Sequence, residues 1–277
     1  MKKTLIIGCG YLGKRIAHNL REAGREVRGT TRSEARAAEL EADGIPAALL
    51  ELETAGEAAA LEGEWEAAVY CAAPGKGGRE ELVFRDAAAA CRDRLAENGL
   101  RRFVYVSSTG VYHQDSGELL DEASPAEPPE GRPALLREAE KIILEGDTGD
   151  NIVVRLGGLY GPGRSPIEWL RRPGFRERLR GSAEGWMNWI HIDDAAAAVC
   201  AAVNRGRRGE LYLGVDGAPV KRIDFYRCAA ELAGEEPPEL DTASTDLGKR
   251  LSNRKLVEEL GVSLLYPDYR RGLESIA

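Results

Sequence analysis

A glycine-rich loop near the start of the chain constrains its fold more than any other feature. The loop holds Gly8, Gly10 and Gly13, follows an apolar run at residues 5–7, and opens into a helical stretch at residues 14–21. Gly8 permits a tight turn, Gly10 leaves room for a pyrophosphate, and Gly13 allows close helix–strand packing. The helix N-terminus offers N–H groups and partial positive charge to phosphates. This context predicts a dinucleotide site, contacted by Gly8, Gly10, Tyr11, Leu12 and Gly13.

Apolar runs of strand length alternate with helical patterns along the rest of the chain. We expect strands at residues 4–7, 26–30, 47–50, 67–72, 103–107, 152–156 and 211–214. We expect helices at residues 11–23, 33–42, 79–97, 134–145, 193–204 and 222–233. Several strands are nearly continuous in Val, Ile, Leu and Tyr, which is typical of strands covered on both faces. The alternation predicts an α/β fold with a doubly wound parallel sheet, that is, a Rossmann fold.

Two segments interrupt the alternation, residues 112–133 and residues 161–189. Residues 112–133 are polar and carry four prolines, so we expect a long irregular loop, and such loops are often functional. We predict an NAD(P)-binding Rossmann domain over residues 1–160, with its sheet completed by about residues 187–214. Residues 161–277 are expected to form a smaller substrate-binding lobe with the C-terminal elements. Ligands of open α/β sheets bind at the carboxyl ends of the strands, so this lobe is expected to cover the cofactor.

Composition and charge exclude several classes of protein. The 277-residue chain has a net charge of −8 at pH 7, which argues against nucleic-acid and anionic-membrane partners. No apolar run approaches the roughly 20 residues that a membrane helix needs, and no signal peptide is evident. The five cysteines have no metal-type spacing and indicate reduced thiols in a cytoplasmic protein. We expect no metal, a small-molecule substrate, and a monomer or homodimer.

Five motifs in a fixed order span almost the whole chain. After the glycine loop come VYCAA at 69–73, VSSTGVY at 106–112, RLGGLYGPG at 155–163 and IHIDD at 190–194. Together they resemble the extended short-chain dehydrogenase/reductase superfamily, and its NAD-dependent epimerase/dehydratase branch in particular. The loop here is of the GxGxxG type, whereas most of that superfamily has one more residue between the first two glycines. The chain therefore resembles an atypical subgroup.

The catalytic residues depart from that family. The resemblance implies a Ser or Thr after the fifth strand, which Ser108 supplies, and a Tyr-x-x-x-Lys pair on the next helix. One alignment places Arg132 at the Tyr position and Leu136 at the Lys position. Another places Arg137 and Lys141 there. Neither alignment supplies a tyrosine, so the resemblance implies the fold without the usual proton-transfer chemistry.

The end of the second strand bears on cofactor choice. Thr30 or Thr31 stands where a carboxylate would bind the ribose 2′-hydroxyl. Arg32 and Ser33 are suited to a 2′-phosphate, so we predict NADP, with NAD as the alternative. The competing interpretation is that Arg32 is a solvated residue opening the next helix. Further expected cofactor contacts are Glu51, Leu52, Cys71, Ala72, Ala73, Ser107 and Gly157.

Ser108, Tyr112 and His113 are the catalytic candidates. We expect Ser108 to orient a substrate oxygen, while Tyr112, His113 or a water carries the proton, because imidazole exchanges protons near neutral pH. The alternatives are an ordinary strand-end serine and a tyrosine that only packs. For Tyr160 packing is the better explanation, and for Asp193 or Asp194 helix capping. Cys9, at a helix N-terminus, has either a lowered thiol pKa and redox sensitivity or merely a size that fits.

Arginines dominate the candidates for substrate binding. Guanidinium groups match phosphate oxygens, so we expect Arg132, Arg164 and Asn188 to bind an anionic substrate, with a solvated surface as the alternative. Further arginines follow at 171, 172, 176, 178 and 180. The predicted function is an NAD(P)-dependent oxidoreductase or epimerase/dehydratase-like enzyme on a small anionic, nucleotide-sugar-like substrate. The alternative is a non-catalytic NAD(P)-binding redox sensor or binding module, which loss of the Tyr–Lys pair favours.

Overall fold

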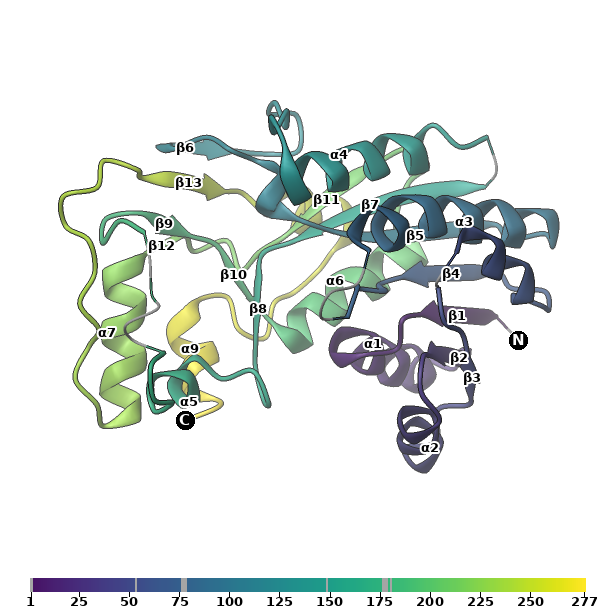
Figure 1. The fold of residues 1–277 in the computed structure, drawn as a ribbon, viewed down its shortest axis with the longest axis horizontal. Coiled ribbons are helices and arrows are strands. Elements are labelled where there is room, and N and C mark those ends of the chain that lie inside the picture. Colours follow the sequence, from purple (N-terminus) through teal and green to yellow (C-terminus); the bar gives the residue numbers. More distant parts are fainter. Residues whose placement is uncertain (1, 53, 76–78, 148, 176–178, 180) are drawn as a thin grey trace. The chain divides into compact units, whose positions relative to one another are not determined.

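The computed structural model describes residues 2–52, 54–75, 79–147, 149–175, 179 and 181–277 (Figure 1). The chain forms two compact units. The first contains residues 1–111, 127–155 and 196–212, and the second contains residues 112–126, 156–195 and 213–277. Within the described residues, none of the helices combines the length and the apolar character needed to cross a membrane.

A seven-stranded sheet forms the centre of the fold. Its strand order is β11 (Leu211–Gly214), β7 (Asp150–Leu156), β5 (Arg102–Ser108), β4 (Ala67–Tyr70), β1 (Lys3–Ile7), β2 (Glu26–Thr31) and β3 (Ala47–Leu49). β1 pairs in parallel with both β2 and β4, so that Leu5 lies opposite Arg28 on one side and Ala68 on the other. The chain builds outward from β1 in one direction through β3 and then returns to continue through β4. This confirms the predicted doubly wound α/β fold, with its switch point between β1 and β4.

Helices cover this sheet in two layers. The main ones are α1 (Tyr11–Glu22), α2 (Glu34–Ala42), α3 (Ala87–Glu97), α4 (Gly131–Leu144) and α6 (Ile192–Arg205). Arg92 of α3 donates hydrogen bonds to the carbonyls of Ile142 and Ile143 at the end of α4. The Cys200 thiol of α6 donates to the Ile16 carbonyl of α1 at 3.8 Å. Figure 1 shows α3 and α4 side by side on one side of the sheet, with α1 and α6 on the other. Short 3₁₀ helices lie at Ala55–Ala60 and Thr109–Val111, and a short π-helix at Leu82–Asp86 directly precedes α3.

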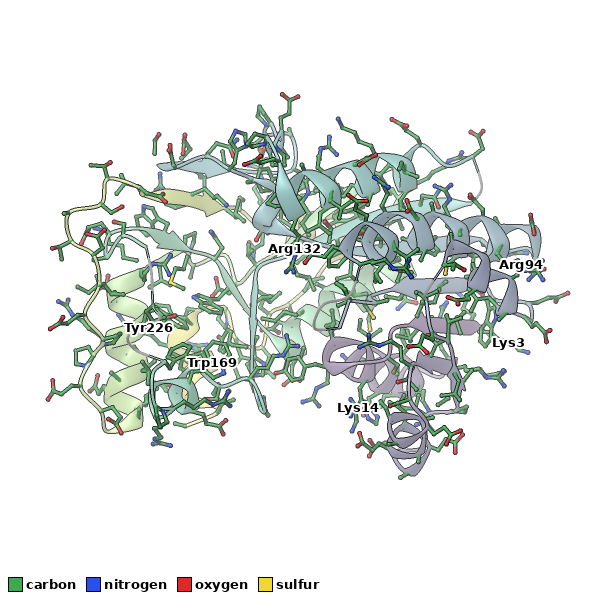
Figure 2. The ribbon with its side chains drawn as sticks, viewed as in Figure 1. Lys3, Lys14, Arg94, Arg132, Trp169 and Tyr226 are labelled. Carbon is green, nitrogen blue, oxygen red and sulfur yellow. The ribbon has the colours of Figure 1, made fainter. Side chains whose placement is uncertain are left out.

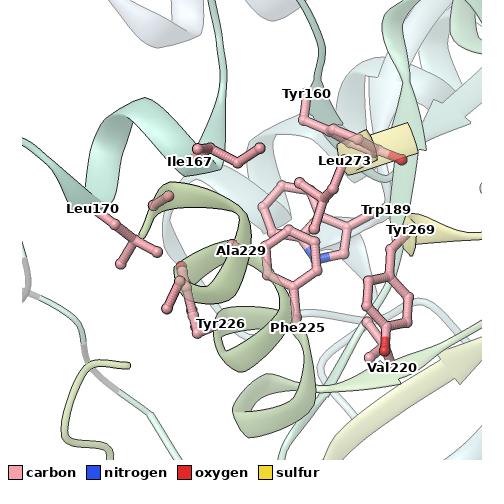
Figure 3. Close-up of a cluster of buried hydrophobic side chains, with 12 residues drawn as sticks. Tyr160, Ile167, Leu170, Trp189, Val220, Phe225, Tyr226, Ala229, Tyr269 and Leu273 are labelled. Carbon is pink, nitrogen blue, oxygen red and sulfur yellow. The ribbon is translucent and has the colours of Figure 1, made fainter. Parts of the chain in front are cut away.

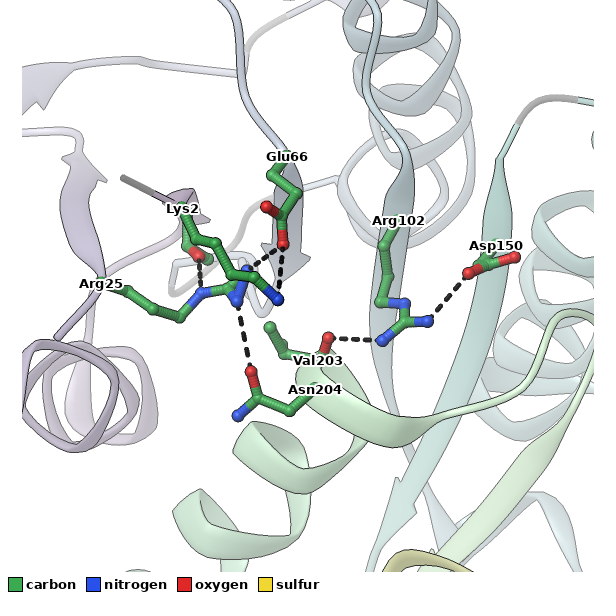
Figure 4. Close-up of polar contacts among 8 residues, drawn as sticks. Lys2, Arg25, Glu66, Arg102, Asp150, Val203 and Asn204 are labelled. Carbon is green, nitrogen blue, oxygen red and sulfur yellow. Dashed lines mark hydrogen bonds and ion pairs between the residues drawn. The ribbon is translucent and has the colours of Figure 1, made fainter. Parts of the chain in front are cut away.

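A buried arginine ties three of these elements together (Figure 4). The Arg25 guanidinium, just before β2, donates to Thr4 of β1 at 2.8 Å, Glu66 at 3.0 Å and Asn204 of α6 at 3.2 Å. Arg102 of β5 donates in turn to the Val203 carbonyl. These bonds satisfy charges that would otherwise be costly to bury. They lie at the amino ends of the strands, opposite the glycine loop, which follows the carboxyl end of β1.

The second unit has two small sheets and its own core. β8 (Gly158–Tyr160) pairs with β10 (Trp189–His191), and a four-stranded sheet has the order β12 (Val220–Lys221), β9 (Trp186–Met187), β13 (Gly248–Leu251) and β6 (Ser116–Leu120). Its helices are α5 (Pro166–Leu170), α7 (Arg222–Ala233), α8 (Arg254–Leu260) and α9 (Tyr269–Glu274). Aromatic rings form the core of this unit (Figure 3). Trp189 stacks on Phe225 with ring centroids 4.5 Å apart.

The prediction of one irregular loop over residues 112–133 is wrong in part. Residues Ser116–Leu120 form β6, which pairs in parallel with β13, so Leu119 lies opposite Arg250. The partner strand is more than a hundred residues away in the chain, and nothing local signals it. α4 also begins at Gly131 rather than residue 134, because a proline such as Pro133 is tolerated in the first turn of a helix.

A buried ion pair connects α4 to β7 in the first unit. Arg155 donates to both carboxylate oxygens of Glu140, at 2.8 and 2.6 Å, and the two side chains are 2% and 0% exposed. Arg137 lies 3.4 Å from the same carboxylate. The carboxylate thus compensates a guanidinium that has no access to water.

Glu140→Gln should therefore lower the free energy of unfolding by about 3–5 kcal/mol, because it leaves the Arg155 charge buried without compensation. The matched control is Glu138→Gln on the same helix, whose carboxylate pairs with Arg85 at the surface and should contribute less than about 1 kcal/mol. Urea unfolding followed by circular dichroism measures both. Equal, small losses in the two variants would contradict this account.

Candidate functional site

The glycine loop brings two strand ends into backbone contact. Gly8 has φ +85°, and its N–H donates to the Thr30 hydroxyl at 3.1 Å. A Cβ atom added at Gly8 would lie 2.4 Å from the Cα atom of Ala72. Only glycine permits this approach, so the loop after β1 and the loop after β4 form one surface.

The start of α1 is open toward a ligand. A Cβ atom on Gly13 would lie 2.8 Å from the Gly8 carbonyl oxygen, so helix and loop are in close contact. A Cβ atom on Gly10 would meet only that oxygen, at 4.0 Å. α1 begins at Tyr11 with no side-chain cap and no acidic residue in its first turn. The residues therefore fit a pyrophosphate, which would find backbone N–H groups and no competing carboxylate.

Cys9 lies beneath this loop and is 1% exposed. Its Sγ atom would lie 2.8 Å from a Cβ atom on Gly29, so the thiol fills the space beside β2. Burial raises the pKa of Cys9 to about 11. Of the two alternatives for Cys9, these observations favour a residue whose size fits the site, because desolvation outweighs the neighbouring positive charges.

The residues predicted to favour NADP over NAD follow β2, and two further expected cofactor contacts follow β3. The Arg32 side chain is exposed, and its Nη1 atom would lie 2.8 Å from a Cβ atom on Gly75, in the loop after β4. The Ser33 hydroxyl accepts a hydrogen bond from the Arg36 N–H and caps α2. Glu51 is exposed and Leu52 half-buried just after β3. Within the described part of the chain, Arg32 has no carboxylate partner at ion-pair distance.

Further expected cofactor and catalytic residues of the first unit end β4 and β5. Cys71 and Ala72 are half-buried and Ala73 is exposed, while the Cys71 thiol donates to the Gly8 carbonyl at 3.2 Å. Ser107 is buried. The half-buried Ser108 accepts a hydrogen bond from the Gly110 N–H at 3.1 Å. The Ser108 hydroxyl still has its own proton to donate.

Tyr112 and His113 differ sharply within the second unit. Tyr112 is 1% exposed, and its hydroxyl donates to the Asp121 carbonyl at 2.7 Å. That phenol holds the loop together and is poorly placed to exchange a proton with a ligand. His113 is exposed and lines a cavity.

The three residues predicted to bind substrate have other contacts. The Arg132 guanidinium pairs with Glu80 and lies 5.8 Å from the ring centroid of Phe84 (Figure 2). The Asn188 amide donates to the Lys249 carbonyl and accepts from the Leu251 N–H, so both its ends bind β13. Arg164 is exposed in the turn after β8. Arg176, Arg178 and Arg180 lie outside the described residues.

Gly157 and the acidic pair after β10 have structural roles. A Cβ atom on Gly157 would lie 2.7 Å from the Asn188 carbonyl oxygen. Asp194 accepts the N–H groups of Leu265 and Tyr266 at 2.7 and 2.8 Å. Asp193 and Asp194 both lie in the first turn of α6. The Asp194 carboxylate binds these N–H groups outside its own helix, whereas capping by Asp193 stays a prediction. His191 precedes α6, and its Nδ1 atom accepts the Asp193 N–H.

The second unit contains a cavity of about 270 Å³. Its lining residues come from the start of the 112–126 segment, from β9 and β13, and from the N-terminus of α7. They include His113, Gln114, Trp186, Arg222 and Lys249. Of these, sequence reasoning found only His113. Arg222 stood at the start of an expected helix, and Lys249 lies on β13, whose sequence GKRL has one large apolar residue and therefore shows no strand pattern.

The comparisons with known proteins agree with this fold and loop. A family model described as NAD(P)H-binding matches residues 8–172, which is more than half of the chain. The chain belongs to this NAD(P)H-binding family. It is also 29% identical to Protein YeeZ of Escherichia coli over 97% of each chain.

Two further relatives carry names of reactions. A solved structure of a putative NAD-dependent epimerase/dehydratase from Methylobacillus flagellatus is 29% identical, has a TM-score of 0.80, and covers 99% of this chain and 97% of its own. A ketoreductase of Stigmatella aurantiaca, whose substrate is 4-hydroxy-2-methyl-3-oxo-4-farnesyl-3,4-dihydroquinoline-1-oxide, is 27% identical over 84% of this chain and 74% of its own. The relatives of this chain thus include a putative epimerase/dehydratase and a ketoreductase.

Gly10→Val tests the loop directly. Its side chain would enter space that is empty in the protein but lies where the pyrophosphate would approach the backbone. We expect unchanged stability and at least about tenfold weaker NADPH binding, because hydrogen bonds to a charged group contribute about 1.5–3 kcal/mol. NADPH fluorescence titration measures the affinity, and thermal unfolding checks the fold. Unchanged affinity in a folded Gly10→Val variant would place the site elsewhere.

Proposed function

We propose that this protein is an NAD(P)-dependent oxidoreductase or epimerase/dehydratase-like enzyme acting on a small anionic molecule. One observation carries the proposal: His113, an expected proton carrier, lines a cavity that also contains two cationic side chains, Arg222 and Lys249. The similarity to a ketoreductase and to a putative epimerase/dehydratase supports a reaction of this class. All five cysteines are free thiols, which supports a reducing, cytoplasmic location.

The cofactor residues favour NADP(H). The loop from Gly8 to Gly13 would hold the pyrophosphate at the start of α1. Arg32 and Ser33 would hold a 2′-phosphate, since Arg32 is exposed and no carboxylate stands at the end of β2. When bound, the nicotinamide supplies hydride transfer.

Arg32→Ala should narrow the preference for NADPH over NADH by about tenfold, because it removes one charge-assisted hydrogen-bond partner. The matched control is Arg28→Ala, an exposed arginine of β2 whose guanidinium lies over the Trp65 ring. It should leave the preference unchanged. Titration with both cofactors decides the matter, and equal wild-type affinities for NADPH and NADH would refute the assignment.

The proton-transfer residues of the proposed reaction are Ser108 and His113. The Ser108 hydroxyl would donate to the substrate oxygen while its own oxygen stays held by the Gly110 N–H. The His113 imidazole would give or accept the proton. Tyr112 is the weaker candidate, because its hydroxyl is bonded to the Asp121 carbonyl. Arg132, which one of the two alignments places at the family's tyrosine position, is paired with Glu80 and stays protonated.

His113→Asn should reduce kcat by about 100-fold or more, the scale of a lost general acid or base. Tyr112→Phe is the comparison variant, and its main effect should be on stability. The assay follows nicotinamide absorbance over a panel of small keto and hydroxy acids. Wild-type rates in both His113→Asn and Ser108→Ala would overturn these roles. Tight NADPH binding without turnover of any substrate would favour the redox-sensor function instead.

A further inference from the structure

We propose that the cavity of the second unit binds the oxyanion group, carboxylate or phosphate, of a small organic acid through Arg222 and Lys249. This inference deepens the proposed function, because it names the group by which the substrate is held. It rests on the polar atoms that line the cavity and on which of them already have partners inside the protein.

Arg222 is the first residue of α7. Its backbone N–H donates to the Gly185 carbonyl at 2.9 Å, which fixes the start of the helix. The guanidinium lies against Gly181, where an added Cβ atom would be 3.1 Å from both Nε and Nη2. Nε is buried, and within the part of the chain that the structure describes it has no hydrogen-bond partner. An unsatisfied buried donor costs free energy, which a bound oxyanion would offset.

Lys249 supplies the second cation. Its half-buried ammonium donates one hydrogen bond to the Tyr112 carbonyl. An ammonium has three N–H donors, and no carboxylate of the described residues lies at ion-pair distance from this one. Burial lowers the pKa of Lys249, and Asp246 opposes that shift. The remaining donors are available to a ligand.

The two carboxylates of the cavity wall already accept hydrogen bonds from donors within the protein. Asp115 accepts a hydrogen bond from the Ser116 hydroxyl at 3.1 Å, and Asp246 accepts one from the Gly248 N–H at 2.8 Å. The negative groups therefore have donors within the protein, whereas no acceptor side chain among the described residues binds the positive groups. A ligand that completes the hydrogen bonding of this cavity must bring acceptor oxygens with negative charge.

The cavity volume and one further atom without a partner limit the size and the chemistry of the ligand. The volume of about 270 Å³ lies just below the range of drug-sized ligand pockets, which run from about 300 to 1,000 Å³, so the ligand must be small. Gln114 donates to the Pro125 carbonyl at 2.8 Å, while its buried Oε1 atom has no partner within the described residues. A hydroxyl group on the ligand would satisfy that acceptor. The cavity thus suits a small organic acid that carries a hydroxyl group and has either a carboxylate or a phosphate as its oxyanion.

The test uses the full chain without cofactor. Trp186 lines the cavity, so its fluorescence reports binding during titrations with glycolate and with inorganic phosphate, in chloride at constant ionic strength. We expect saturable binding of at least one of them. Arg222→Gln and Lys249→Gln should each weaken it at least about tenfold. The stronger of the two titrants identifies the oxyanion.

The matched control is Lys221→Gln. Lys221 precedes Arg222, and its ammonium lies 6.0 Å from the Trp186 ring centroid, but it pairs with Glu184 and does not line the cavity. It should leave binding unchanged. If Arg222→Gln fails to fold, Arg222→Lys keeps the charge but loses the planar fork, and weakened binding in that folded variant supports the proposal.

No saturable response in the wild type, or equal weakening by Lys221→Gln and Arg222→Gln, would overturn the oxyanion site. These outcomes are independent of NADPH affinity and turnover. Failure of the proposed function would therefore appear as lost cofactor binding or absent catalysis in a chain that still binds the anion.

Discussion

The contact between the Gly8 backbone and Ala72 is the constraint on which the cofactor surface depends. It exists because no side chain stands between the loop after β1 and the loop after β4, with a would-be Cβ atom only 2.4 Å from the Ala72 Cα atom. Thr30 of β2 joins the same arrangement, since its hydroxyl accepts the Gly8 N–H and its carbonyl accepts the Cys9 N–H. Three neighbouring strand ends are thus fixed around the uncapped start of α1. The open side of Gly10 follows from this arrangement, as does the burial that keeps the Cys9 thiol protonated.

The second unit shows how existing hydrogen bonds separate structural residues from candidate ligand-binding ones. Asn188 and Tyr112 have the chemistry of site residues, yet their polar atoms bind β13 and the Asp121 carbonyl. Arg222, Lys249 and Gln114 keep donors or acceptors that the described residues do not satisfy, and all three line one cavity. Folding leaves such groups unsatisfied only at a cost in free energy. Their concentration in one place is therefore better evidence for a site than residue type alone.

Buried arginines with several hydrogen bonds join the strands and helices of the first unit. Arg25 joins β1, Glu66 and α6, and Arg155 joins β7 to Glu140 of α4. Each guanidinium forms several directed hydrogen bonds, a geometry that a planar five-donor group allows. Glu140 and Arg155 both stood in segments used to align the chain with its family. The sequence did not predict the ion pair between them, since the two residues are brought together only by the packing of α4 on β7.

The sequence by itself determined the Rossmann fold, the order of its elements and the glycine loop, because these depend on local signals. Continuous apolar runs mark strands buried on both faces, and glycine spacing marks a turn that no other residue can make. That no tyrosine stands at the family's catalytic position stays a prediction from the sequence. Short strands such as β6 and β13 escaped prediction because their stability comes from a partner far along the chain. Only the tertiary structure decided that Arg222 and Lys249 share a cavity with His113 while Arg132 pairs with Glu80. Such pairings depend on distances between side chains that are remote in sequence, and no local pattern of residues encodes them.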